Sequence, residues 1–407
     1  MPIDLHPGGV LPSYDGRGIS NLPATIVEAF GGRIDGHPPL SEQVLPRAFF
    51  DGVRTIVLVL VDGLGLHRYR RAVGAHPHLS LAALARNGFE GELTSVLPST
   101  TTTALATLNT GLTPQEHGLM GYKLYLREVD ETANMIRFSP VDKTMPYPRR
   151  RINAQSFFDH VTLYQRLSEL EVSSRVIIKS AYASSAMSRM FYRGAEVVGH
   201  AGTHDAFVYL RRMLEQRDGA PSFIYVYWDP IDSVSHYTGP DSDEVDAEIT
   251  GLADALRRHV LERLRAPDVA LLITADHGHV HTRPTQRLAF NDHPDLLRLL
   301  ERPPTGDSRL PYLHVREGAH DEARTLVERH FGAPVRWHDT ERALAEGWFG
   351  IGDIHPEARS RVGTSLLDVA AGWKVTYRYR EGEPESIGCH GALDTEEMLV
   401  PLIASRL

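Results

Sequence analysis

Short apolar runs and stretches with helical spacing alternate along much of the chain. The first run is TIVLVLV, which is rich in β-branched residues and ends at Asp62-Gly63. Continuous apolar runs of this length are typical of strands that are buried on both faces, as in a parallel sheet. The same pattern predicts further strands at 91–96, 174–179, 223–228 and 269–274, and helices at 79–86, 102–109, 158–170, 204–215 and 243–264.

Strands that alternate with helices in this way indicate an α/β fold with a largely parallel central sheet and helices on both faces. Two regions interrupt the alternation, at about 123–154 and 279–388. The first is Pro-rich and has no clear helix. The second mixes loops with an isolated strand near 312–315, a helix near 322–330 and an extended pair near 365–380. We expect one catalytic domain over 1–407, with a core at about 51–122, 155–278 and 389–407 and a small cap formed by the two interrupting regions.

Composition narrows the class of protein. Apolar residues make up 42% of the chain and charged residues 23%, which is ordinary for a globular protein with a sizeable core. Lys and Arg total 43 against 52 Asp and Glu, a net charge of −9. A general nucleic-acid binder normally has a basic excess, so no nucleic-acid polymer is expected as a partner. A small anionic substrate stays possible, because bound metal ions would supply local positive charge.

Cys389 is the only cysteine, so no disulfide can form within the chain. The first residues have neither the basic nor the apolar segment of a signal peptide. The longest strongly apolar run, 56–61, is well short of the roughly 20 residues that cross a bilayer. We therefore expect a cytoplasmic protein without a membrane segment.

Candidate chemistry follows the predicted strands, where ligands bind in open α/β sheets. An acid, a hydroxyl-rich segment and two Asp/His pairs each follow a different strand. Each has an ordinary alternative: a turn at Asp62, a helix N-cap within the Ser99–Thr103 run, or a solvated loop pair. An acid and a histidine at the end of a buried strand need partners, however. The side chains concerned are Asp62, the Ser99–Thr103 run, Asp232 with His236, and Asp276 with His277.

Carboxylates and neutral imidazoles are suitable ligands for zinc, and related sites accept manganese or iron. Two divalent ions about 4 Å apart can clamp a phosphoryl group. A Thr hydroxyl at the N-terminus of a helix can become a nucleophile beside such an ion. Other histidines, such as His76, His78, His281 and His293, are assigned to surface or packing roles.

Five sequence blocks run in a characteristic order over most of the chain. They are VLVDG at Asp62, PSTTTTALATLNTGLTPQEHG at 98–118, DPIDSVSHYTGP at 229–240, TADHGH at 274–279, and CHGALDTEEMLVPLI at 389–403. On these blocks the chain resembles the type I phosphodiesterase/nucleotide pyrophosphatase family of the alkaline phosphatase superfamily. The resemblance implies an alkaline-phosphatase-like fold.

The resemblance also implies roles for seven residues. Thr101, three residues after Pro98, is the implied nucleophile, and the later Thr110-Gly111 pair favours it over its neighbours. Two divalent ions are implied, with zinc as the first expectation and manganese or iron as alternatives. The implied ligands are Asp232, His236 and His390 for the first ion, and Asp62, Asp276 and His277, together with Thr101, for the second.

One departure from the family bears on the substrate. Nucleotide pyrophosphatases commonly carry a phosphate-binding Asn shortly after the His-Gly pair, and residues 117–123 contain none. Tyr122 or Lys123 could donate to the substrate instead.

We expect a two-metal hydrolase of a small phosphate ester, possibly a nucleotide. The first expectation is a phosphodiesterase/nucleotide pyrophosphatase with a covalent phospho-threonine intermediate. The alternatives are a phosphomonoesterase or phosphonate hydrolase on the same scaffold, or a metal-binding scaffold protein without turnover. The sequence leaves the natural substrate and the oligomeric state open.

Overall fold

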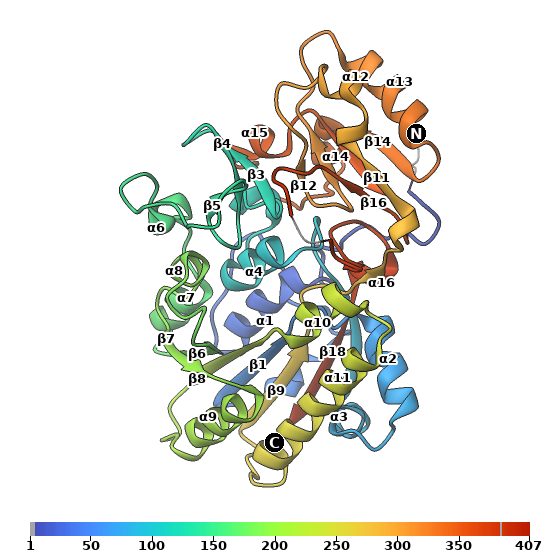
Figure 1. The fold of residues 1–407 in the computed structure, drawn as a ribbon. Helices are drawn as coiled ribbons and strands as arrows, with labels where there is room; N and C mark the ends of the chain where they lie inside the picture. The colour runs from blue at the N-terminus through green and yellow to red at the C-terminus, as the bar shows by residue number, and fades with distance from the viewer. Residues whose placement is uncertain (1–4, 383–384) are drawn as a thin grey trace.

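The centre of the fold is a seven-stranded sheet (Figure 1) in a computed structural model that describes residues 5–382 and 385–407. The strand order is β2-β18-β9-β1-β8-β6-β7. All seven residues of β1 are buried, as its apolar sequence predicts. The strands are β1 (Thr55–Val61), β2 (Phe89–Thr94), β6 (Ser173–Lys179), β7 (Glu196–His200), β8 (Ser222–Trp228), β9 (Val269–Thr274) and β18 (Leu399–Arg406).

Most pairs in this sheet are parallel. β1 pairs in parallel with β8 and β9, and β6 pairs in parallel with β7 and β8. The exception is β18, which lies antiparallel between β2 and β9. The predicted mixed α/β fold with a largely parallel central sheet is confirmed.

Helices cover the sheet in two groups (Figure 1). α1, α4, α7 and α8 pack against one another, and α11 packs against α3, α9 and α10. The helices of the core are α1 (Leu22–Ala29), α2 (Leu66–Ala75), α3 (Ser80–Asn87), α4 (Thr101–Thr110), α5 (Pro114–His117), α6 (Ala154–Phe157), α7 (Leu163–Glu169), α8 (Ala186–Phe191), α9 (Thr203–Glu215), α10 (Pro230–Thr238), α11 (Asp243–Leu256) and α16 (Thr395–Met398).

Two helices differ from the prediction for local reasons. The stretch predicted as one helix at 158–170 is divided, and α7 begins only after Thr162. Thr162 and Gln165 form a capping box, in which each side chain accepts a hydrogen bond from the other residue's backbone N–H. The long helix predicted at 243–264 ends as α11 at Leu256 and continues as a π-helical turn, Arg257–Leu261.

Both interrupting regions contribute to a second seven-stranded sheet, with the order β14-β15-β13-β12-β3-β4-β5. The strand expected to be isolated near 312–315 is β13, and it pairs on both sides, with β12 and β15. A separate apolar cluster, which includes Phe290, Leu313 and Leu367, packs this part of the chain. The strands are β3 (Lys123–Leu126), β4 (Glu131–Asn134), β5 (Ser139–Pro140), β12 (Thr305–Gly306), β13 (Pro311–Leu313), β14 (Val335–Asp339) and β15 (Ser365–Val369).

The second sheet lies beyond the carboxyl ends of the core strands (Figure 1), accompanied by short helices and two separate two-stranded sheets, β10-β17 and β11-β16. Within the described residues, no helix is both long and apolar enough to span a bilayer. The cytoplasmic location stays a prediction. The smaller elements are α12 (Pro294–Leu297), α13 (His320–Phe331), α14 (Thr340–Ala345), α15 (Ala358–Val362), β10 (Val280–His281), β11 (Arg287–Ala289), β16 (Lys374–Thr376) and β17 (Gly388–Cys389).

Candidate metal centre

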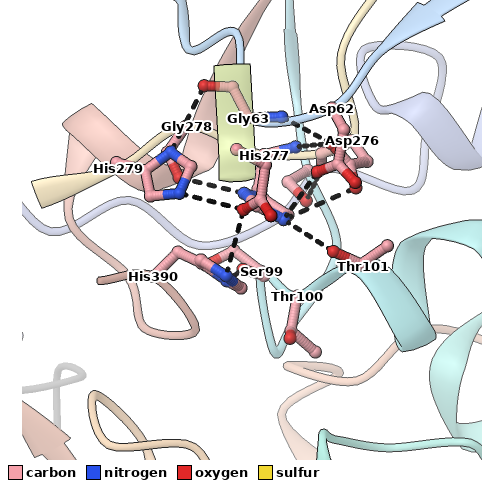
Figure 2. A network of polar contacts seen from close by, with 12 residues as sticks. Asp62, Gly63, Ser99, Thr100, Thr101, Asp276, His277, Gly278, His279 and His390 are labelled. Carbon is pink, nitrogen blue, oxygen red and sulfur yellow. Dashed lines mark hydrogen bonds and ion pairs between the residues drawn. The ribbon is translucent and has the colours of Figure 1, made fainter. Parts of the chain in front are cut away.

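The predicted site residues come from five separate segments that meet at the carboxyl ends of the core strands. Asp62 directly follows β1, and Asp276 and His277 follow β9. Asp232 and His236 lie one turn apart on α10, which follows β8. Thr101 is the first residue of α4, and His390 directly follows β17. Figure 2 shows Asp62, Thr101, Asp276, His277 and His390 close together.

One group of ligands surrounds Nε2 of His277. This atom lies 3.5 Å from Oδ1 of Asp62, 3.4 Å from Oδ2 of Asp276 and 3.1 Å from Oγ1 of Thr101. Ligand atoms bound about 2.0–2.1 Å from a tetrahedral ion lie about 3.3 Å from one another. The spacing of this group therefore suits one divalent ion in a tetrahedral site, and the three residues Asp62, Asp276 and His277 could hold it.

A second group surrounds Oδ1 of Asp232. Nε2 of His236 lies 3.3 Å from this oxygen and Nε2 of His390 lies 3.7 Å from it. The other ring nitrogens face backbone carbonyls, with His236 Nδ1 2.8 Å from Gly388 O and His390 Nδ1 2.9 Å from Ser99 O. Metal-binding histidines usually have such a partner, because it fixes the tautomer and leaves the other nitrogen free to bind the ion.

The first group carries more negative charge than its surroundings compensate. Asp62 and Asp276 are fully buried, and neither Asp62 Oδ1 nor Asp276 Oδ2 has a hydrogen-bond partner among the described residues. Burial, and then the neighbouring carboxylates of Asp276 and Asp232, raise the pKa of Asp62 well above its ordinary value, although the hydroxyl of Tyr227 donates to it. Two buried carboxylates without a cation are costly. A bound divalent ion would remove that cost.

Asp232 and His236 stabilise each other's charge. Burial alone would raise the pKa of Asp232, but the charge and hydrogen bond of His236 hold it well below its ordinary value. Burial would lower the pKa of His236, but Asp232 raises it to about 9. An ion at this position would compete with the proton on His236.

The four consecutive threonines have different environments. Thr100 occupies the N-cap position of α4, but its hydroxyl donates to Asp307 Oδ1 at 3.3 Å rather than accepting from the helix. The hydroxyl of Thr102 donates to Gly121 O at 2.9 Å. Only the hydroxyl of Thr101 contacts a predicted metal ligand, His277.

The site opens into a cleft of about 480 Å³ between the core and the second sheet. Tyr122 and Lys123, the predicted substrate contacts, line this cleft together with Thr101. Asn134 of β4 also lines it and donates from Nδ2 to the Tyr122 hydroxyl oxygen at 2.7 Å. Asp307 lies in the same wall, where burial raises its pKa to about 6.

The sequence analysis assigned no role to three residues of this region: Asn134, Asp307 and His279. Asn134 lies on β4 and Asp307 directly follows β12, and no local pattern connects either residue to the core. His279 ends the Asp-His-Gly-His block, and Nε2 of His279 lies 3.0 Å from Oδ1 of Asp232. The sequence signal that could have identified His279 is its position two residues after the predicted ligand His277. His293, predicted to have a surface or packing role, lies in the second interrupting region beside Asp295 and His330, and this half-buried group could also hold an ion.

Comparison with known proteins identifies the family. The family model of type I phosphodiesterase/nucleotide pyrophosphatase matches residues 56–393. The chain belongs to this family. It is therefore a metal-dependent hydrolase of phosphate esters, and the Asp/His cluster described above is where its metals could bind. No curated protein sequence matches the chain.

Solved structures share the fold of this family member at low identity. Murine ectonucleotide pyrophosphatase/phosphodiesterase 5 is 17% identical, with a TM-score of 0.62 over 86% of this chain and 87% of that one. Phosphonoacetate hydrolase from Sinorhizobium meliloti 1021, in complex with phosphonoformate, is also 17% identical, with a TM-score of 0.63 over 87% of this chain and 90% of that one. The murine enzyme is also known in an inactive form in complex with AMP.

Proposed function

We propose that the protein is a phosphodiesterase of the nucleotide pyrophosphatase type, in which Thr101 is the nucleophile. The observation that carries this proposal is the position of the Thr101 hydroxyl. It lies at the first residue of α4 and 3.1 Å from Nε2 of His277, within a group of buried metal-ligating side chains. The free amides in the first turn of a helix also bind phosphate oxygens.

Two divalent ions complete this site in the proposal. The first ion is held by Asp232, His236 and His390, and the second by Asp62, Asp276 and His277 together with Thr101. Zinc is the preferred ion for both positions, since imidazole and carboxylate ligands with tetrahedral spacing suit it, and manganese or iron could replace it. When bound, the two ions lower the pKa of the nucleophile and stabilise charge on the phosphoryl and leaving oxygens.

The proposed reaction consists of two displacements at phosphorus, the first by Thr101 and the second by water. The Thr101 hydroxyl gives up its proton to solvent and Oγ1 attacks phosphorus in line with the leaving group. The bond from phosphorus to the leaving oxygen breaks, that oxygen takes a proton from solvent, and a phospho-threonine forms. Water next attacks the same phosphorus from the opposite side, breaks the bond to Oγ1 and restores the Thr101 hydroxyl. A loose phosphoryl transition state needs mainly positioning and charge stabilisation, which a preorganised site provides.

Tyr122 and Asn134 take the place of the Asn that residues 117–123 lack. Asn134 Nδ2 donates to the Tyr122 hydroxyl oxygen and fixes the Tyr122 ring at the wall of the cleft. Nζ of Lys123 lies 5.0 Å from the centre of the Tyr379 ring, in a cation–π contact at the same cleft. The substrate in this proposal is a small phosphate diester or pyrophosphate, with a nucleotide as one possibility.

A phosphonate hydrolase or phosphomonoesterase is the second candidate. Two observations support this candidate. The fold is similar to that of phosphonoacetate hydrolase, and residues 117–123 lack the Asn that nucleotide pyrophosphatases commonly carry. A metal-binding scaffold without turnover would need a defective site, whereas all seven predicted positions carry competent side chains.

One assay tests the proposal. The protein is stripped of metal, reloaded with zinc or manganese, and assayed on bis-p-nitrophenyl phosphate, p-nitrophenyl phosphate and phosphonoacetate. The proposal predicts metal-dependent turnover that is fastest on the diester. A clear preference for the monoester or the phosphonate would move the protein to the second candidate, and no turnover with full metal loading would indicate a scaffold.

A further inference from the structure

His279 is buried against the carboxylate of Asp232. The His279 side chain is 1% exposed, whereas that of His236 is 31% exposed. The cleft is lined by Asp232, His236 and His390, and His279 is absent from its lining among the described residues. His279 therefore contacts Asp232 from within the protein, where its ligand atom lies within 4.8 Å of those of His277 and His390. Its Nε2 lies 3.0 Å from Asp232 Oδ1, a hydrogen-bonding distance.

The other end of the His279 ring lies against the turn after β1. Nδ1 of His279 lies 3.3 Å from the carbonyl oxygen of Gly63 (Figure 2). A Cβ atom on Gly63 would lie 2.5 Å from Cε1 of His279 and 3.0 Å from Cα of Asp232. The glycine, whose φ is +76°, is thus what allows the ring to lie in this narrow space.

We propose that His279 is a positioning residue that fixes the Asp232 carboxylate for the first metal ion. This inference rests on the proposed two-metal function. Carboxylates that bind metals are themselves held by hydrogen bonds, and removing such a partner typically lowers metal affinity. With its single proton on Nε2, which makes the shorter of the two contacts, the ring donates to Asp232 Oδ1, and the carboxylate keeps one orientation toward His236 and His390.

His279 acts through Asp232 rather than as a fourth ligand. A catalytic metal keeps a position open for water or substrate, and three protein ligands leave one such position in a tetrahedral site. Asp232, His236 and His390 already provide three. If His279 also bound the ion, a tetrahedral site would hold four protein ligands, and no position would remain for the water or substrate of the proposed reaction.

Cobalt binding, followed by visible absorption and by competition with a chelator of known affinity, tests this role at each site separately. The Asp276→Asn background weakens the second site and isolates the first, and the His390→Ala background isolates the second. In the first background, His279→Ala should lower the affinity for the ion about 10- to 100-fold, and His279→Gln, which keeps an N–H donor, should recover most of the loss. In the second background, His279→Ala should change the affinity less than about twofold.

His314→Ala is the matched control, because His314 is a buried histidine of the second sheet that lies outside the site. Equal losses at both sites, or no loss at the first site, would overturn the positioning role. A cobalt spectrum of the first site that loses one nitrogen ligand in His279→Ala would overturn it in favour of direct ligation. If the unmutated protein bound fewer than two ions, the proposed function would fail instead, and the two failures are therefore distinguishable.

Discussion

The hydroxyl oxygen of Thr101 lies 3.1 Å from Nε2 of His277, although 176 positions separate the two residues in the chain. α4 presents Thr101 from one strand connection, and the end of β9 presents His277 from another. His277 Nδ1 lies 3.0 Å from Gly278 O, so its Nε2 is available to an ion. This contact places the proposed nucleophile within reach of the second metal.

Replacing Thr101 should separate catalysis from folding. Thr101→Ala removes the attacking oxygen but leaves six other predicted ligands, so kcat on bis-p-nitrophenyl phosphate should fall on the order of 10³-fold or more with little loss of bound metal. The matched controls are Thr100→Ala and Thr102→Ala, whose hydroxyls bond Asp307 and Gly121 O. They should cost about 1 kcal/mol, or less than tenfold in rate. Full turnover by Thr101→Ala with loss in a control would show that the nucleophile is a neighbour.

Tyr122→Phe tests the proposed replacement for the missing Asn. Losing one hydrogen bond to a charged phosphate oxygen costs about 1.5–3 kcal/mol, so kcat/KM for the diester should fall about 10- to 100-fold. Tyr125→Phe is the control three residues away on β3, because its hydroxyl donates to Asp130 on the surface. Equal effects of the two substitutions in steady-state kinetics would remove Tyr122 from the substrate site.

Several features of the fold and the site could be predicted from local pattern. The run ending at Asp62 is buried on both faces, and apolar content alone predicts that. Because parallel strands end at the same edge of a sheet, the acids and histidines after β1, β8 and β9 were expected to meet. His390 was connected to them only by the resemblance, since it follows a long insertion and no spacing rule reaches it.

Other features depend on contacts that sequence pattern does not encode. β18 begins within the last sequence block and runs antiparallel in an otherwise mostly parallel sheet, where its apolar sequence would suit either direction. The second sheet joins strands from two insertions, so the placement of Asn134 and Asp307 in the cleft depends on long-range pairing. Single-sequence periodicity does not specify which of these short strands become neighbours.

A buried ion pair should stabilise the contact between the second sheet and the core. Arg309 Nη2 lies 2.8 Å from Glu397 Oε1, and both side chains are fully buried. Arg309→Met leaves a buried carboxyl group without its partner and should lower the free energy of unfolding by about 3–5 kcal/mol. The double variant Arg309→Met/Glu397→Leu should lose less, and urea denaturation of the metal-free protein measures both.

The control for this prediction is Arg359→Met, which breaks an exposed pair with Glu341 and should cost about 0–1 kcal/mol. A double variant that is less stable than Arg309→Met alone would mean that the pair acts through packing rather than charge.

Asp307 should make stability fall as the pH rises. Burial raises its folded pKa to about 6 from an ordinary value of 3.8, so its contribution is present below pH 3.8 and is lost as the pH rises through 6. Between pH 5 and 7.5 the loss should be about 1 kcal/mol. The amide of Asp307→Asn cannot ionise, so this variant should lack the pH-dependent loss. The difference in unfolding free energy between the variant and the unmutated protein should therefore change by about 1 kcal/mol between pH 5 and 7.5. Parallel urea titrations at the two pH values check this, and an unchanged difference would contradict it.

The central claim is that two ions bind beside Thr101, and anomalous diffraction from crystals of the zinc-loaded protein tests it most directly. The account predicts two peaks about 4 Å apart. One should lie about 2 Å from ligand atoms of Asp62, Asp276 and His277, and the other about 2 Å from those of Asp232, His236 and His390. A single peak, or ions more than about 5 Å from these side chains at full loading, would contradict the account.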